Sequence, residues 1–221
     1  MNKARLSLPL RCIGLILYFE IFHTLSVGSS AVAAERDSAM PKMMNSAASG
    51  MVTKRLFLLR HGQAMHNPRA EKARAEGCSH ETFLKLMQED DVLDAELTEL
   101  GKAQAIALAN SKALQEKLKD VKLVISSPLS RALATAECAL PLRNNPSAKR
   151  ISIENFREIN GWLLNAKRKP IQTLRNIFKV WDFTDLESEE DALWTPSLES
   201  EDSCGERGYQ GKLWRCSFKL C

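Results

Sequence analysis

Short apolar runs that stop abruptly at polar residues constrain the fold of this 221-residue chain more than any other feature. Residues 55–59 form one such run without hydrophobic alternation, which predicts a strand buried on both faces of a parallel sheet. Residues 123–125 form a second run, and Ile151 and Ile153 alternate with polar neighbours in a third predicted strand. Helical patterns separate the strands, so we predict a layered α/β domain with a mostly parallel central sheet.

Two segments between the strands have the pattern of helices. From Leu97 to Leu118 the apolar residues recur at helical spacing, and Thr98 is placed to cap the first turn. Residues 129–138 form a second predicted helix, with Pro128 favoured at its opening.

The N-terminal segment has the pattern of a targeting signal. Basic residues precede an apolar stretch from Cys12 to Val27, and small residues follow, so residues 1–34 are predicted to be a signal with cleavage near Ala34. Cleavage predicts a secretory or extracellular protein; organelle targeting and a cytoplasmic location are the alternatives. The stretch is too short and interrupted to predict a stable membrane span. Residues 35–52, rich in Ala, Ser and Met, are predicted to be a linker.

Charge and cysteine spacing narrow the classes of partner. The formal net charge is +4 and the basic residues are scattered, which does not favour nucleic acid as a partner. No cysteines or histidines have the spacing of metal ligands, so a structural zinc is not expected. No cofactor is expected either.

The strongest candidate for chemistry is His61, in Arg60-His61-Gly62 directly after the first predicted strand. Ligands usually bind at strand ends in open α/β sheets. A neutral imidazole can attack phosphorus and carry the phosphoryl group as phosphohistidine. Arg60 offers a fork of donors for phosphate oxygens, and Asn67 offers a neutral donor from the following loop.

Two further candidates follow the other predicted strands. Arg131 lies in the first turn of the helix after Ser126-Ser127-Pro128 and brings a second cation to the same sheet edge. Glu158 follows the third strand and is a candidate to protonate the leaving oxygen. A partly buried carboxyl group with a raised pKa would serve that role near neutral pH.

In combination these motifs resemble the signatures of the histidine phosphatase superfamily, in their usual order. The motifs are Arg60-His61-Gly62 with Asn67, Leu97-Thr98 through Gly101, Ser126-Ser127-Pro128 with Arg131, Thr135 and Ala136, and then Arg157-Glu158. The resemblance runs from about Arg55 to Thr195, and residues 183–196 look like the plant-type phosphoglycerate-mutase-like proteins in particular.

The resemblance implies a phosphoglycerate-mutase-like three-layer sandwich over residues 53–200. It implies that His61 is the nucleophile and Glu158 the acid, that no metal is needed, and that the substrate phosphate is bound by Arg60, Asn67 and Arg131. His66 and His80 match no catalytic position, and we expect both to face solvent from loops.

The sequence departs from the family pattern near its end. The family's second catalytic histidine lies on a late core strand, whereas the last histidine here is His80. We therefore expect an incomplete domain that lacks this strand, with an open edge along residues 55–59 and an atypical tail over residues 201–221.

Two classes of function remain. The first is a phosphatase that hydrolyses a phosphate monoester, on a small phosphorylated metabolite or a phosphoprotein, through phosphohistidine at His61. The second is a catalytically impaired pseudoenzyme or scaffold that binds phosphate without turnover because the second histidine is absent. A surface protein in which the motif has no role is a third, less favoured hypothesis.

Overall fold

The computed structural model describes residues 15–20 and 54–217. Its sheet has the strand order β2-β1-β3-β4, with β1 at Leu15–Glu20, β2 at Lys54–Leu59, β3 at Leu123–Ser126 and β4 at Lys149–Ser152. Strands β3 and β4 pair in parallel, whereas β1 is antiparallel to both β2 and β3. Strands β2, β3 and β4 therefore run in one direction, and their carboxyl ends meet at the same edge.

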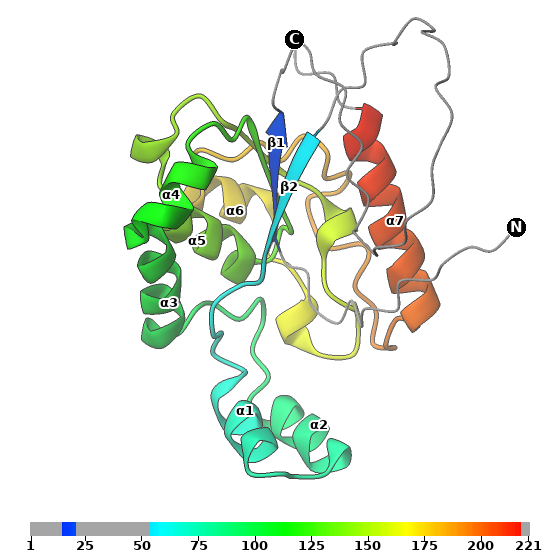
Figure 1. Cartoon of the computed structure of the whole chain (residues 1–221). Coiled ribbons are helices and arrows are strands. Elements are labelled where there is room, and N and C mark those ends of the chain that lie inside the picture. Colours follow the sequence, from blue (N-terminus) through cyan, green and yellow to red (C-terminus); the bar gives the residue numbers. More distant parts are fainter. Residues whose placement is uncertain (1–14, 21–53, 218–221) are drawn as a thin grey trace, which may run out of the picture.

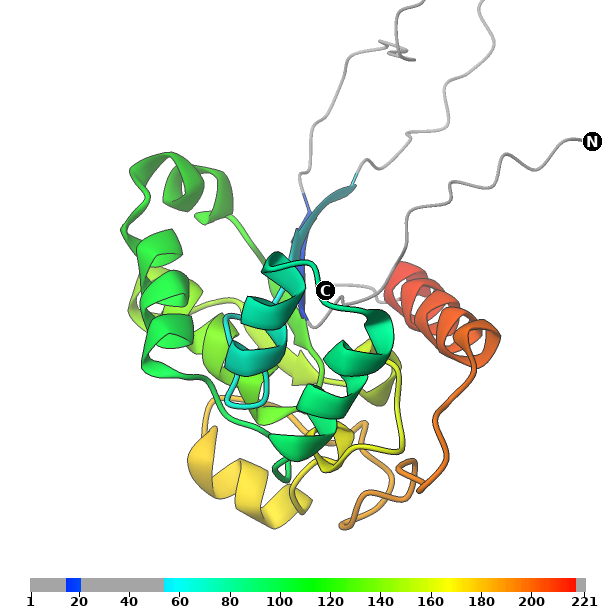
Figure 2. The same cartoon turned by 90° about the horizontal axis from the view of Figure 1, so that it is seen from below.

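Helices cover both faces of this sheet. In the described part of the chain they are α1 (Pro68–Ala75), α2 (His80–Glu89), α3 (Glu99–Asn110), α4 (Lys112–Leu118), α5 (Ser130–Ala139), α6 (Ile171–Ile177) and α7 (Glu201–Ser217), with short 3-10 turns η1 (Leu142–Asn144), η2 (Glu154–Phe156) and η3 (Leu164–Ala166). Helices α3 to α6 lie on one side of the sheet and α7 on the other (Figures 1 and 2). The predicted layered α/β fold is confirmed.

Strand β1 occupies an unexpected inner position. It places Leu17 opposite Phe57 of β2 and Val124 of β3, so the backbone of β2 is paired on the side that faces β3. The gap expected beside β2 is therefore filled on this side by a segment from the predicted signal. Strand β2 still ends the sheet among the described residues, so the predicted open edge lies on its other side. The rest of residues 1–34, the predicted linker 35–52 and the end of the tail lie outside the described residues. Within the described chain, no helix has the length and apolar character needed to cross a membrane.

Burial on both faces was predicted for residues 55–59, but the structure shows it for β3 instead. All four residues of β3 are buried. On β2, Leu58 is 57% exposed and Leu56 38%, whereas Phe57 and Leu59 pack against the core. One face of β2 is therefore incompletely covered, and the prediction for β2 is wrong.

Local capping sets the helix boundaries. The Thr98 hydroxyl accepts a hydrogen bond from the Gly101 amide at 3.0 Å, as predicted for a helix cap. The expected single helix to Leu118 is divided into α3 and α4 at Ser111, whose backbone is extended and whose hydroxyl caps α4. Helix α5 begins at Ser130, close to the predicted start.

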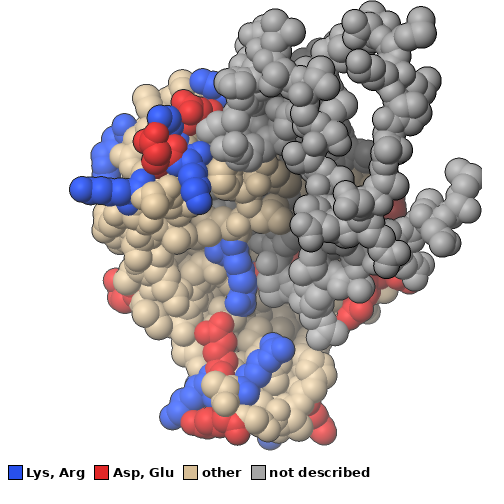
Figure 3. All heavy atoms as spheres, in the orientation of Figure 1, with Lys and Arg blue, Asp and Glu red and all other residues tan. Residues whose placement is uncertain are grey.

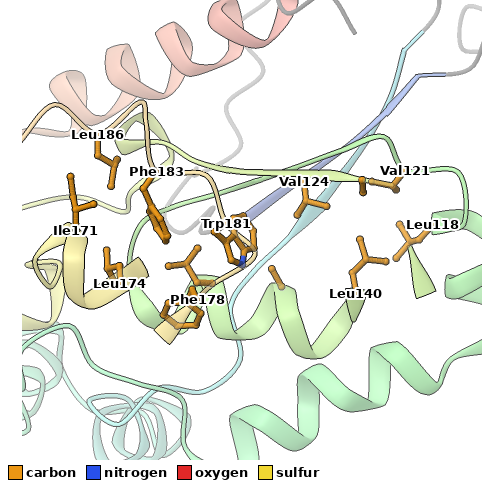
Figure 4. Packing of buried hydrophobic residues seen from close by; sticks show 13 residues of the cluster. Leu118, Val121, Val124, Leu140, Ile171, Leu174, Phe178, Trp181, Phe183 and Leu186 are labelled. Atoms are coloured by element: carbon orange, nitrogen blue, oxygen red, sulfur yellow. The ribbon is translucent and has the colours of Figure 1, made fainter. Parts of the chain in front are cut away.

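The main core lies between β3 and helices α5 and α6 (Figure 4). Aromatic residues Phe178, Trp181 and Phe183 follow α6 and pack against Leu174 of that helix and the aliphatic residues of α5. This packing holds the segment after α6 against the sheet, where Asp182 also bridges to Ile151 of β4.

Helices α1 and α2 form a separate projection below the carboxyl edge of the sheet (Figure 1). Arg69 on α1 pairs with Glu89 at 2.7 Å and with Asp90 at 2.9 Å. Acidic and basic side chains are interspersed on this projection and elsewhere on the visible described surface (Figure 3). Such exposed pairs contribute little to stability.

The pairing of β1 predicts a strong effect of proline. Leu17→Pro removes a backbone donor from an inner strand, so we expect the free energy of unfolding to fall by about 3 kcal/mol or more. Urea unfolding of the full chain measures this, with Leu17→Val as a control that keeps the amide donor. Equal stability of the proline variant and the wild type would show that β1 does not belong to the sheet.

Candidate active site

Three side chains from different parts of the chain meet at the carboxyl edge of the sheet. His61 follows β2, Arg131 lies in the first turn of α5 after β3, and Glu158 follows β4 and η2. His61 Nε2 lies 2.7 Å from Glu158 Oε1, and Arg131 Nη2 donates to Glu158 Oε2 at 3.2 Å. The structure therefore brings together three of the five predicted site residues around one carboxylate.

The ring of His61 is held by its own backbone neighbour. Nδ1 lies 2.6 Å from the carbonyl oxygen of Gly62. Since that oxygen can only accept a hydrogen bond, Nδ1 carries the proton and Nε2 is the atom directed at Glu158. The turn cannot tolerate a side chain at Gly62, because an added Cβ would lie 2.4 Å from the Gly101 carbonyl oxygen.

Glu158 is charged in this environment. Burial alone would raise the pKa of Glu158, but the positive charge of Arg131 and the contact with His61 outweigh it and lower that pKa below its ordinary value. The raised pKa predicted from the sequence is therefore wrong. The cause is the pairing with Arg131, which sequence position did not reveal.

Arg131 is 1% exposed, and its guanidinium N–H groups differ in whether they have a hydrogen-bond partner. Nη1 donates to the carbonyl oxygen of Asn165 at 2.6 Å. Nε is buried and has no hydrogen-bond partner among the described residues. A buried guanidinium with an unsatisfied donor suits an anion, since leaving such a group unpaired is costly.

Asp94 fixes the helix that carries Arg131. The helix cap position, Leu129, provides no side-chain cap. Instead Asp94 accepts bonds from the amide of Ser130 at 2.8 Å and from its hydroxyl at 2.6 Å. Burial raises the pKa of Asp94. Sequence reasoning missed this residue because it lies 36 positions before the helix it caps.

Arg157, next to Glu158, is a buried structural cation. It makes two bonds to the Asp191 carboxylate, at 2.9 and 2.7 Å, and one to Asn160 Oδ1 at 2.9 Å. Burial opposes the charge of Asp191, yet the bonds from Arg157 leave the pKa of Asp191 below its ordinary value. The pair anchors the segment around Glu158 to the acidic stretch that the sequence resemblance singled out.

Helix α7 is attached to the same segment. Arg207 pairs with Glu199 through Nη2 at 2.7 Å, and donates to the carbonyl oxygens of Arg157 and Glu158, each at 3.0 Å. At Gly211 the helix approaches η2 so closely that an added Cβ would lie 2.8 Å from Asn155 Cβ. The tail has no clear hydrophobic period, so this polar attachment was not predicted.

Arg60 and Asn67 flank the site. Arg60 is exposed at the end of β2. Asn67 is buried, and its Oδ1 accepts a hydrogen bond from the Ala64 amide at 2.9 Å, which closes the turn before α1. Their contacts with phosphate stay predictions.

The two remaining described histidines differ from each other. His80 is exposed, as expected, but begins α2 rather than lying in a loop. His66 is 2% exposed, so its predicted solvent-facing position is wrong. The cause is a backbone bond from Met65 to Glu96 at 2.9 Å and a bridge between Ala64 and Leu97, which fold this loop onto the segment before α3.

The site thus combines an imidazole, a guanidinium and a carboxylate at the edge of an α/β sheet. This combination is typical of α/β proteins in which a histidine side chain reacts with a phosphate group. Among the described residues, no cluster of three or more His, Cys, Asp or Glu side chains could hold a metal ion. The chain belongs to the histidine phosphatase superfamily (branch 1), whose family model matches residues 56–208.

Curated relatives come from Arabidopsis thaliana. Phosphoglycerate mutase-like protein 1 is 32% identical over 187 residues, which cover 73% of this chain and 63% of that protein. A phosphoglycerate mutase-like protein is 29% identical, with 73% and 65% covered. The chain therefore spans less than two thirds of these relatives. No solved structure matches it.

The Arg157–Asp191 pair predicts a defined pH dependence. Because the pKa of Asp191 lies below 3.8 in the folded chain, its stabilisation is present above that pH and is lost as the pH falls through the folded pKa. We expect Asp191→Asn to lower the free energy of unfolding by about 2–3 kcal/mol at pH 7 and 5, and by less below pH 3.8.

Urea unfolding across this pH range measures the difference. Glu190→Gln, at an exposed neighbouring position, is the control. If the difference in the free energy of unfolding between Asp191→Asn and the wild type grew as the pH fell, it would contradict an ionised Asp191 paired with Arg157.

The contacts of Arg207 predict that α7 stabilises the segment around Glu158. Arg207→Ala leaves the partly buried Glu199 carboxylate and several carbonyl groups without a donor, so we expect a loss of about 1–3 kcal/mol in the free energy of unfolding. Arg175→Ala, at an exposed position on α6, should change it by less than about 0.5 kcal/mol. Equal effects of the two substitutions would mean that α7 is not attached through Arg207.

Proposed function

We propose that this protein is a phosphatase of the histidine phosphatase type that hydrolyses a phosphate monoester through phosphohistidine at His61. The observation that carries the proposal is the contact of 2.7 Å between His61 Nε2 and Glu158, with Arg131 on the other carboxylate oxygen. Family membership supports the class of reaction. The substrate we propose is a small phosphorylated metabolite or a phosphoprotein.

The His61–Glu158 contact suggests where the catalytic proton comes from. Nδ1–H of His61 donates to the Gly62 carbonyl. Nε2 and the ionised Glu158 carboxylate would both be acceptors, so a further proton must lie between them. When Nε2 forms its bond to phosphorus, this proton passes to Glu158. Glu158 then delivers it to the ester oxygen as the P–O bond breaks.

The second half of the reaction reverses these roles. Glu158, again a carboxylate, accepts a proton from water as the water oxygen attacks the phosphorus of phosphohistidine. The P–N bond breaks, inorganic phosphate leaves, and the proton returns to the His61–Glu158 contact. Arg131 stabilises the charge on the transferring phosphoryl group in both steps.

Variants at both residues test this proposal. We expect His61→Ala to abolish hydrolysis of p-nitrophenyl phosphate and the phosphohistidine trapped by rapid alkaline quenching. Glu158→Gln should lower kcat by about 10²–10⁴-fold, whereas the exposed Glu76→Gln should not change it. Turnover that survives His61→Ala would contradict the proposal.

The same experiment addresses the non-catalytic alternative. Saturable phosphate binding by the wild type, with no trapped phosphohistidine and no turnover, would indicate a phosphate-binding scaffold instead.

A secretory destination remains a proposal drawn from residues 1–34. Strand β1 comes from this segment, so cleavage near Ala34 would remove an inner strand from the sheet. N-terminal sequencing of the protein isolated from cells tests the proposal. A mature chain that starts near Glu35 would support cleavage, and a chain that keeps residues 15–20 would exclude it.

A further inference from the structure

His66 is a buried imidazole that the reaction outlined above does not use. The residue is 2% exposed, and its Nδ1 is buried without a hydrogen-bond partner among the described residues. Buried polar atoms are nearly always hydrogen-bonded in folded proteins. An unpaired ring nitrogen therefore points to a ligand.

The surroundings of His66 are those of the candidate active site. Burial and then the charge of Arg131 lower the pKa of His66 to about 3, and the charges of Glu158, His61 and Arg60 also act on its ring. The ring is therefore neutral near neutral pH and lies within electrostatic reach of all four groups. A neutral ring can offer one N–H donor without adding a cation beside Arg131.

A second unsatisfied donor lies in the same site. Nε of Arg131 is also buried without a hydrogen-bond partner in the described part of the chain. The charge of Arg131 acts on the His66 ring, so one anion that accepted from both nitrogens would satisfy two donors that otherwise lack partners.

The backbone holds His66 in place without help from its ring. The amide of Met65 donates to the Glu96 carbonyl at 2.9 Å, and the amide of Asn67 donates to the Ala64 carbonyl at 2.9 Å. Asn67 Oδ1 also accepts a bond from the Ala64 amide at 2.9 Å. These bonds on both sides of His66 fix the backbone of the turn that carries the ring.

We propose that His66 is a phosphate ligand, whose Nδ1–H donates a hydrogen bond to an oxygen of the phosphoryl group bound beside His61 and Arg131. The proposal rests on the proposed function and adds a second imidazole to the site. It also gives His66 a role that its position in the sequence motifs did not indicate.

Binding of inorganic phosphate and of orthovanadate to the full chain, measured by calorimetry, tests the proposal. His66→Phe fills the position with a ring that has no donor, and we expect the Kd for both anions to rise roughly tenfold to a hundredfold. His66→Gln restores an N–H donor and should keep the Kd within about threefold of the wild type. His80→Gln, which removes the exposed histidine of α2, should leave the Kd unchanged.

Nuclear magnetic resonance of the wild-type chain provides a measurement that needs no variant. We expect added phosphate to shift the ring signals of His66, with a proton present on Nδ1, and to leave those of His80 unchanged. An unprotonated Nδ1 in the phosphate complex, or an unshifted ring, would overturn the proposal.

The outcomes separate this proposal from the proposed function. Equal Kd values for His66→Phe and the wild type would overturn the role of His66, even where His61 is still phosphorylated. Weaker phosphate binding by His66→Phe, together with no phosphohistidine in the wild type, would support the ligand role and contradict the phosphatase function. No phosphate binding by the wild type would overturn both.

Discussion

The Glu158 carboxylate is the interaction on which the site depends. One of its oxygens contacts Nε2 of His61, the proposed nucleophile, and the other accepts a bond from Arg131. Three strands must end at the same edge for these groups to meet, so the contact links the fold directly to the chemistry. The charges that keep Glu158 ionised also make it a weaker base, so in the proposed reaction a proton received from His61 is readily passed on to the ester oxygen.

Arg131, Arg157 and the backbone of Glu158 are each held by a polar contact from a distant segment. Asp94 caps the helix of Arg131, Asp191 neutralises Arg157, and Arg207 binds the carbonyl of Glu158 itself. Buried polar groups of this kind are costly unless every partner is present. The positions of the candidate catalytic groups are therefore set by networks that span most of the described chain, including its last helix.

The sequence was sufficient to predict the residues that follow strands and carry their own motif. His61, Arg131 and Glu158 were found because each follows a predicted strand, and ligands usually bind at strand ends in such sheets. The stabilising carboxylates were missed, since a capping or pairing partner tens of residues away leaves no local pattern. Strand β1 was missed because an apolar run suits a signal as well as a strand. The burial of His66 depends on a loop contact with Glu96, which no periodicity reports.

The central claim is that Nε2 of His61 is the nucleophile while Nδ1 stays bound to the Gly62 carbonyl. The most direct measurement is the site of phosphorylation on the His61 ring, determined by nuclear magnetic resonance of the phosphorylated chain kept at alkaline pH. The account predicts a phosphoryl group on Nε2 and a proton on Nδ1. A phosphoryl group on Nδ1, or on a residue other than His61, would contradict it.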